Sequence, residues 1–410
     1  MIFTMKKNFI VILSTILIIN IFSCSNKIKV NNSEELIKIF ANPRYNIKIK
    51  LAAGDYYLEP QEIIDSTCAN CQDPEQKVNA TAGLIIAGEN ITIRGPADTS
   101  AVIHTNSGYG LFIKDCENCV IQNLVITDGI RDTSAKASDA AIVVKNSSAI
   151  IKNNIIRGNL GSEKLIEKNV VGVMGICGRE NSNITIENNK IMQNSWDGIA
   201  LFRDAEAVIR GNYIDGVDKA GGRSAKGGRG VGIGVTWNAR AEIVDNYIAR
   251  YWKGIGVFVD ANCVIRNNII EDLITWGIAL WDADEGKPYA AIENNIIFDT
   301  GACGVSITSS NQDKNQGKLI GNIIIKTAQD SSYDSPRYYC YQTALAEHKV
   351  PENFSIAQNI FYDNRTVSDS LPTHNVSKKV FLENNKFKNF CIFKYFRQSK
   401  FSHYLQEISK

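Results

Sequence analysis

A short segment that contains asparagine recurs along the chain, and it constrains the fold more than any other feature. Examples are ITIENNKIMQN at residue 184, AVIRGNYIDG at residue 207 and CVIRNNIIED at residue 263. A repeat of this kind predicts a solenoid in which each copy forms one coil. The recurring asparagines are spaced by 22 to 37 residues and are Asn123, Asn154, Asn189, Asn212, Asn246, Asn268, Asn295, Asn322, Asn359 and Asn385.

Within each copy, isoleucines alternate with polar residues, as Ile209 does with Arg210 and Ile265 with Arg266. A period of two is typical of a half-buried strand. No segment has a helical stripe long enough for a crossover helix, which disfavours doubly wound and barrel folds. Strands must therefore stack on their equivalents in the next coil, ~4.8 Å away. The pattern predicts an all-β chain that forms one parallel β-helix of about ten coils.

Two further segments support a resemblance to a known family. Together with LAAGDYYL (residues 51–58) and ENITIRG (residues 89–95), the repeat resembles the right-handed parallel β-helix of the pectate-lyase-like superfamily, over about residues 46–390. The resemblance implies the fold. It does not imply one activity, because this family contains lyases, hydrolases, epimerases, adhesins and binding proteins. We interpret the asparagines as scaffold, in which stacked amides hydrogen-bond to one another.

The first residues have the layout of an export signal. Lys6 and Lys7 precede an apolar run, which predicts a signal peptide over residues 1–23 and not a membrane span. Ser23 and Cys24 resemble the bacterial lipobox, so we expect lipidation at Cys24 and a lipid-anchored protein of the bacterial cell envelope, on the periplasmic or the outer surface. An ordinary core cysteine behind a plain signal peptide is the alternative.

The two ends of a solenoid expose strand edges that need covering. We expect residues 24–45 to form a polar tether and an N-terminal cap, in which Asn32 and Glu35 form the capping box of a short helix. Residues 391–410 are expected to form a C-terminal cap or tail.

Charge and cysteine content narrow the partners. The net charge is +2 without basic blocks, which argues against nucleic acid as a partner. We expect a monomer that meets the membrane only through its lipid anchor. Export favours disulfides within Cys68-Ala-Asn-Cys71 and Cys116-Glu-Asn-Cys119, and a four-thiolate zinc site is the alternative.

One column of aligned residues is unusually small. Outward positions between buried aliphatic residues are occupied by Ala200, Gly234, Gly256, Ala279 and Ser306. Small residues are poor strand formers and gain nothing by facing solvent. Either a ligand approaches this face closely, or an inserted segment covers it.

Aromatic residues flank that column on both sides. Such rows suit the faces of sugar rings, although they can equally stack on each other to stiffen the coils. A loop with six glycines between Gly221 and Gly232 adds basic residues beside them, which favours an acidic ligand. The candidate substrate-binding residues are Trp196, Phe202, Arg203, Arg229, Trp237, Trp252, Phe258, Trp276 and Trp281.

The segments SWDGIALFRDA and YWKGIGVFVDA share a frame but place Asp197 and Lys253 at equivalent positions two rungs apart. A uronate lyase needs a base and a cation, and Lys253 and Arg250 are candidates for these roles. In the β-helix lyases that the chain resembles, bound calcium also fills the cation's role, so calcium is a candidate cofactor. A glycosidase needs two carboxylates, which Asp197 with Asp282 or Glu271 supplies.

Several family signatures are absent from the sequence, among them the Gly-His-Gly of β-helix polygalacturonases and the Asp-Pro-His-Glu of alginate epimerases. The four histidines are isolated, so neither a histidine metal cluster nor a triad is indicated. Two hypotheses follow. The protein binds an extended acidic polysaccharide and cleaves it by a lyase-type mechanism, or it is a surface-tethered glycan-binding or structural solenoid without catalysis.

Overall fold

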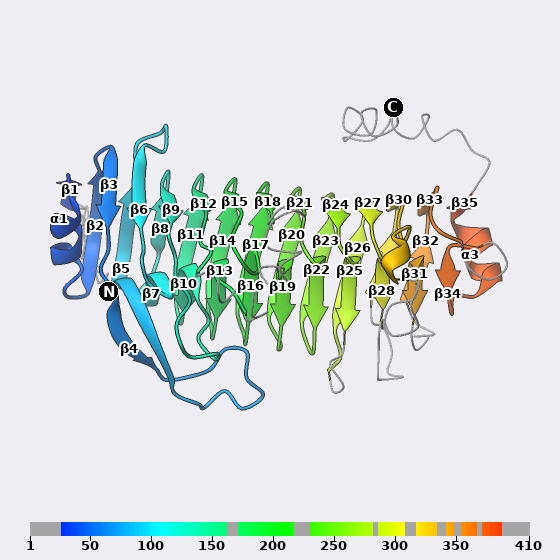
Figure 1. Cartoon of the computed structure of the whole chain (residues 1–410), viewed down its shortest axis with the longest axis horizontal. Helices are drawn as coiled ribbons and strands as arrows, with labels where there is room; N and C mark the ends of the chain where they lie inside the picture. Colours follow the sequence, from blue (N-terminus) through cyan, green and yellow to red (C-terminus); the bar gives the residue numbers. More distant parts are fainter. Residues whose placement is uncertain are drawn as a thin grey trace, which may run out of the picture.

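The chain forms an elongated parallel β-solenoid (Figure 1). A computed structural model describes residues 26–161, 171–216, 230–281, 286–307, 317–333, 342–347, 354–366 and 371–387. In that part, a typical coil contributes two strands to a 23-stranded sheet and one strand to a 12-stranded sheet. The large sheet makes two faces of the solenoid, which we call face 1 and face 2, and the smaller sheet, sheet B, makes the third.

Face 1 carries the candidate functional site described below. Its strands are β4 (Gln61–Asp65), β5 (Val78–Arg94), β7 (Tyr109–Glu117), β10 (Ala140–Lys145), β13 (Met174–Arg179), β16 (Ile199–Phe202), β19 (Val231–Thr236), β22 (Lys253–Phe258), β25 (Trp276–Trp281), β28 (Cys303–Ile307), β31 (Thr343–Glu347) and β34 (Thr373–His374). The long β5 continues into face 2. It bends at Gly88 (φ 121°), where a side chain would lie 1.9 Å from the Arg44 carbonyl oxygen.

Face 2 and sheet B complete each coil. Face 2 contains β1 (Asn26–Val30), β2 (Arg44–Leu51), β8 (Cys119–Gln122), β11 (Ser148–Lys152), β14 (Asn183–Glu187), β17 (Glu206–Arg210), β20 (Arg240–Val244), β23 (Asn262–Arg266), β26 (Tyr289–Glu293), β29 (Gly317–Ile320) and β32 (Phe354–Ala357). Sheet B contains β3 (Gly54–Tyr57), β6 (Ala101–His104), β9 (Val125–Thr127), β12 (Ile155–Arg157), β15 (Lys190–Met192), β18 (Tyr213–Asp215), β21 (Tyr247–Ala249), β24 (Ile269–Leu273), β27 (Ile296–Thr300), β30 (Ile323–Ile325), β33 (Ile360–Tyr362) and β35 (Lys386–Phe387).

Equivalent residues of successive copies stack in register. Ile209 pairs with Ile186 of the coil before and Ile243 of the coil after, and all three side chains are fully buried. The predicted all-β fold and its strand alternation are therefore confirmed. Among the described strands, β4 alone pairs antiparallel, against the first half of β5.

The predicted asparagine scaffold forms a continuous ladder at the turn between face 2 and sheet B. The Asn246 amide nitrogen donates to Asn268 Oδ1 at 3.0 Å and to the Ile209 carbonyl at 2.9 Å. The described ladder comprises Asn154, Asn189, Asn212, Asn246, Asn268, Asn295, Asn322, Asn359 and Asn385.

Asn123 is the exception, and its assignment to the ladder is wrong. It has a left-handed backbone (φ 57°), and Leu124 takes the ladder position, where its N–H donates to Asn154 Oδ1. The same left-handed position precedes the ladder residue in later coils, for example at Asn188 (φ 56°) and Asn294 (φ 54°). The Asn-Asn pairs thus combine a turn former with a stacking amide, because asparagine tolerates both roles.

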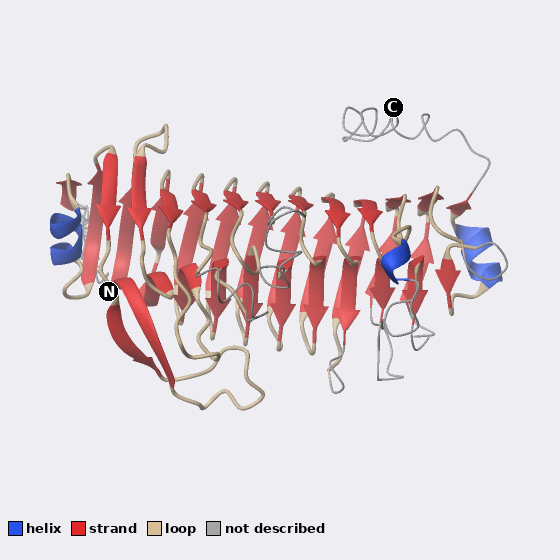
Figure 2. Ribbon diagram, in the orientation of Figure 1, coloured by secondary structure: helices blue, strands red, loops and turns tan. Residues whose placement is uncertain are grey.

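A helix covers each end of the solenoid (Figure 2). At the N-terminal end, α1 (Ser33–Ile39) starts at Asn32, whose side chain accepts from the Glu35 N–H at 2.9 Å. The Glu35 carboxylate accepts in return from the backbone N–H of Asn31, one residue before the N-cap. The predicted capping interaction is therefore present, with Asn31 in place of Asn32 as the donor of this second bond. The expected tether needs a correction, because Asn26–Val30 forms strand β1 and pairs with β2.

At the other end, α3 (Lys378–Asn384) buries Phe381 against the last coils. The sequence repeat, which includes Asn385, predicted another strand there. The structure has a helix instead, and β35, which follows it, pairs with β33. A short 3₁₀ helix, η2 (Ser331–Tyr333), lies between these ends. Residues 1–23, Cys24 and residues 391–410 lie outside the described part. The helices in that part are all too short or too polar to cross a membrane.

The cysteine prediction holds for one pair and is wrong for the other. Cys68 and Cys71 form a disulfide, whereas Cys116 and Cys119 are free thiols that fill the central core. Cys68 belongs to a different apolar cluster, on the outside of face 1. The two motifs therefore do not combine into the alternative four-thiolate zinc site.

Candidate functional site

A groove of about 1300 Å³ lies on the outside of face 1. The predicted column of small residues is present in register, as Ala200–Gly234–Gly256–Ala279–Ser306. We predicted that these residues face solvent, and that is wrong, since all of them are buried. At Gly256 the Phe258 ring lies over the strand, and a Cβ there would be 2.1 Å from Phe258 Cζ. Glycine is needed because an aromatic ring occupies the space of a side chain.

Most of the predicted aromatic residues line this groove. Trp196, Phe202, Trp237, Trp252, Phe258 and Trp281 are among its walls. The rings of Phe258 and Trp281 meet edge to face, with centroids 6.4 Å apart. Trp276 is not a lining residue. It pairs with Lys253 of the preceding rung, and its ring centroid lies 4.9 Å from the lysine ammonium.

Asp197 lies just before β16, at the wall of the groove. Its Oδ1 accepts from the Val231 N–H at 2.5 Å, which reaches across one rung. Burial raises the pKa of this carboxyl to about 7, although the Val231 N–H and the Lys253 ammonium pull it down. A carboxyl in this environment changes charge near neutral pH.

Lys253 begins β22 and lines the same groove. Lys253 pairs with Val231 of β19, one rung away, and the Val231 N–H donates to Asp197, which lies one rung further, just before β16. The predicted two-rung relation is therefore present, at roughly 10 Å along the axis. The ammonium lies 4.9 Å from the Trp276 ring centroid and 5.5 Å from that of Trp281. Burial lowers its pKa to about 8, and Asp197 opposes this shift.

Two predicted catalytic residues belong elsewhere. Arg250 follows β21 of sheet B and pairs with Asp215, with Nε and Oδ1 2.6 Å apart. Glu271 lies in β24 of sheet B and accepts from the Tyr247 hydroxyl. Neither lines the groove. They are close to the tryptophans in sequence, but a turn between sheet B and face 1 separates them from the site.

Arg203 holds the wall of the groove. Its Nε donates to the Ala69 carbonyl at 3.1 Å, and the guanidinium also bonds the Cys71 carbonyl. The same guanidinium lies 4.4 Å above the Trp237 ring, whose Nε1 donates to Asn70 Oδ1 at 3.0 Å. Arg203 thus acts on the site through this wall and not by lining the groove.

Sequence reasoning missed the wall itself, which residues 68–72 and 135–138 contribute. Residues 68–72 lie more than 100 residues before Arg203 and Trp237, so no local pattern connects them. One signal was available. The outward column has larger residues in earlier coils, at Phe112, Val143 and Cys177, and large apolar residues facing outward require a cover.

The remaining predicted site residues, Arg229 and Asp282, lie outside the described part. Within that part, no three histidine, cysteine or acidic side chains converge into a group that could hold a metal. Calcium, named as a candidate cofactor by resemblance, therefore has no cluster of three acidic side chains to bind it among the described residues.

Comparison with known proteins identifies the family of the chain. The profile of the family described as "Right handed beta helix region" matches residues 61–231 and 174–335. The chain belongs to this right-handed β-helix family. No curated protein sequence matches it.

Several solved structures are similar to this chain at low sequence identity. The A-module of the mannuronan C-5 epimerase AlgE6 from Azotobacter vinelandii is 11% identical, with a TM-score of 0.50, over 83% of this chain and 89% of that one. An exopolygalacturonase from Thermotoga maritima is 10% identical (TM-score 0.46; 84% and 88% covered). An alginate lyase from Paenibacillus sp. str. FPU-7 is 14% identical (TM-score 0.40; 85% and 99% covered). These similarities concern the fold.

Proposed function

We propose that this protein is an exported, lipid-anchored envelope protein that binds an acidic polysaccharide in the face 1 groove and cleaves it by elimination. One observation carries the proposal: Asp197 and Lys253, both with pKa values moved toward neutrality, line one aromatic groove. Aromatic walls suit sugar faces, and lysine suits a uronate carboxylate. Buried ionisable groups with perturbed pKa values are typical of functional sites.

The arrangement gives each residue a role. Above about pH 7 Asp197 is mostly ionised, so its carboxylate can take the proton from the carbon beside the uronate carboxyl group. The electron pair of that C–H bond then forms a carbon–carbon double bond as the bond to the glycosidic oxygen breaks. Asp197 returns the proton to the departing oxygen. The Lys253 ammonium neutralises the carboxylate, on which negative charge develops.

A pH profile tests these roles. We expect kcat/KM to rise with pH through about 7, as Asp197 ionises, and to fall through about 8, as Lys253 loses its proton. Asp197→Asn and Lys253→Met should each lower turnover at least ~100-fold. Exposed residues Glu206 and Lys190 provide matched controls, as Glu206→Gln and Lys190→Met. Activity that does not change from about pH 6 to about pH 9, limits about one unit outside the two pKa values, would refute the assignment.

The second hypothesis, a binding protein without catalysis, is favoured by a different observation. The described groove residues include three ionisable side chains, which are Asp197, Lys253 and Lys136. There is no histidine or second carboxylate among them. A screen of uronate-containing and neutral polysaccharides separates the two, if binding and the ultraviolet absorbance of the unsaturated product are both followed. Binding without product supports the second hypothesis, and no binding to any glycan refutes both.

The membrane anchor has its own test. Palmitate labelling of the full chain in a bacterial host should be abolished by Cys24→Ser. Labelling that survives this substitution would refute lipidation at Cys24, without affecting the groove.

A further inference from the structure

Face 1 is covered on the N-terminal side of the groove. Outward side chains Phe112, Val143 and Cys177 form one column on β7, β10 and β13, and all are buried. They pack with Cys68, Ala69 and Ala137 in a separate apolar cluster outside the solenoid. We call residues 66–77 and 131–139, which supply that layer, the cover.

The column changes in size where the cover ends. After Cys177 the next residues in register are Ala200 and Gly234, which lie in the groove. Large apolar side chains contact the cover. At Gly234 a Cβ would meet only Asp197 Oδ2 and Val231 Cβ, 3.7 and 3.8 Å away, so this position leaves room for a ligand. The boundary between covered face and groove therefore lies at β13 and β16.

Charged groups fasten the cover to the solenoid at one end. Asp65, just before the cover, is buried between Lys145 and Arg179, with the Arg179 Nη1 2.8 Å from Asp65 Oδ2. The Tyr109 hydroxyl donates to the same oxygen at 3.0 Å. Arg179 also donates to the Thr67 carbonyl at 2.8 Å.

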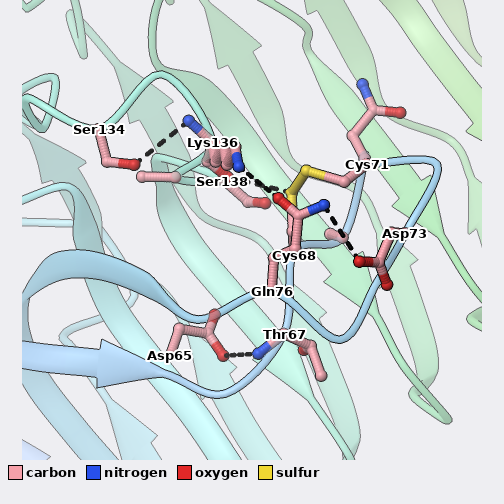
Figure 3. Close-up of a disulfide and its surroundings, with 12 residues drawn as sticks. Asp65, Thr67, Cys68, Cys71, Asp73, Gln76, Ser134, Lys136 and Ser138 are labelled. Carbon is pink, nitrogen blue, oxygen red and sulfur yellow. Dashed lines mark hydrogen bonds between the residues drawn. A yellow bond between two sulfur atoms is a disulfide. The ribbon is translucent and has the colours of Figure 1, made fainter.

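The tip of the cover is held as firmly. The Cys68–Cys71 disulfide closes it, and the Lys136 ammonium bonds Gln76 beside it (Figure 3). On the solenoid side, Arg203 and Trp237 bond the tip at Ala69, Cys71 and Asn70. These contacts fix the cover as a wall of the groove.

Phe258 and Trp281 follow the solenoid axis, since they pair in adjacent rungs and their rings meet edge to face. A glycan lying on them runs along the axis and meets the cover. We propose that the cover blocks the groove, so that the site accepts one end of an acidic glycan chain and not an internal stretch. Asn70 and Lys136 of the wall then face the terminal sugar. This inference rests on the proposed function.

Binding capacity tests the inference. Samples of one uronate polymer, at equal mass concentration but different mean chain length, are titrated with wild-type protein, and chain length is checked afterwards. Binding at chain ends makes the capacity follow the number of chains, so halving the length raises it about twofold. Capacity that follows total mass instead overturns the inference and leaves the proposed function intact. Absence of binding to every acidic glycan overturns both.

A variant gives the converse result. Replacing residues 68–71 by two glycines should open the wall, so that capacity comes to follow mass. If circular dichroism shows that this variant is unfolded, Asn70→Ala combined with Arg203→Ala releases the tip and leaves the Asp65 anchor in place. Glu62→Ala, on an exposed position of β4, is the matched control. If a folded variant with the wall opened still binds with one protein molecule per chain end, the proposed role of the cover is overturned.

Discussion

Replacing Asn246 by alanine should destabilise the solenoid strongly, although no aliphatic core residue is touched. Its Oδ1 accepts from the Asn212 backbone N–H and side-chain amide, both at 3.0 Å, and its Nδ2 donates to the Ile209 carbonyl at 2.9 Å. The site is 2% exposed. Alanine leaves the Asn212 N–H without its partner and removes one donor from the Ile209 carbonyl.

A buried polar group that loses its partner costs about 1–3 kcal/mol, so we expect a loss of about 2–4 kcal/mol. That is a large fraction of the stability of a typical domain, about 5–15 kcal/mol. In a solenoid the loss falls first on the neighbouring coils, because each coil contacts only its neighbours.

Urea unfolding followed by circular dichroism measures the effect as a lower midpoint. The control is Asn294→Gly, which lies beside a ladder residue but is exposed and left-handed (φ 54°). Glycine accepts that backbone, so its change should stay within about 0.5 kcal/mol. If Asn246→Ala costs no more than this control, the ladder does not stabilise the fold and our reasoning fails.

Three further predictions concern other parts of the molecule. Arg179→Met should lower stability by about 3–5 kcal/mol, because buried Asp65 loses one of its two cationic partners. Lys114→Met at the equivalent, partly exposed position should cost less than about 1 kcal/mol in the same urea assay. Burial lowers the pKa of His104, but hydrogen bonds to Asp128 and Asp55 outweigh it and leave the pKa raised above 6.5. The stabilisation of the fold by protonated His104, below about 1 kcal/mol, should be present below pH 6.5 and lost as pH rises through the pKa of the folded state. A stability difference between wild type and His104→Gln that grows with pH would contradict this. Gly256→Ala should push the Phe258 ring into the groove and weaken glycan binding by about 1 kcal/mol without unfolding, as calorimetry on the folded variant would show.

The sequence alone was sufficient for the coil architecture. Strand alternation and the asparagine period are local signals repeated many times, so errors at one coil are corrected by the others. Ile209, Ile243 and Ile265 are buried as predicted, and the ladder from Asn154 to Asn385 exists. The repeat failed at Asn123, where Leu124 takes the ladder position, and at Lys378–Asn384, which forms a helix at the end of the solenoid.

Only part of the candidate site could be predicted from the sequence. Alignment of the copies brought Asp197, Lys253 and the small column together, because register in a parallel stack follows from sequence spacing. It could not place Arg250 or Glu271 correctly, since a turn sends neighbouring residues to different faces. The alternation predicted which side Gly256 faces, but its burial follows from where the Phe258 ring lies.

Tertiary structure alone decided what closes the groove. The cover leaves face 1 after β4 and meets Arg203 and Trp237 more than 100 residues later, through hydrogen bonds to its backbone and to Asn70. Such bonds carry no sequence pattern, because a backbone carbonyl accepts from any guanidinium that reaches it. The repeat therefore determined the solenoid and the register of its charged pair, whereas a non-repeating insertion, fixed by long-range contacts, determined the shape of the site.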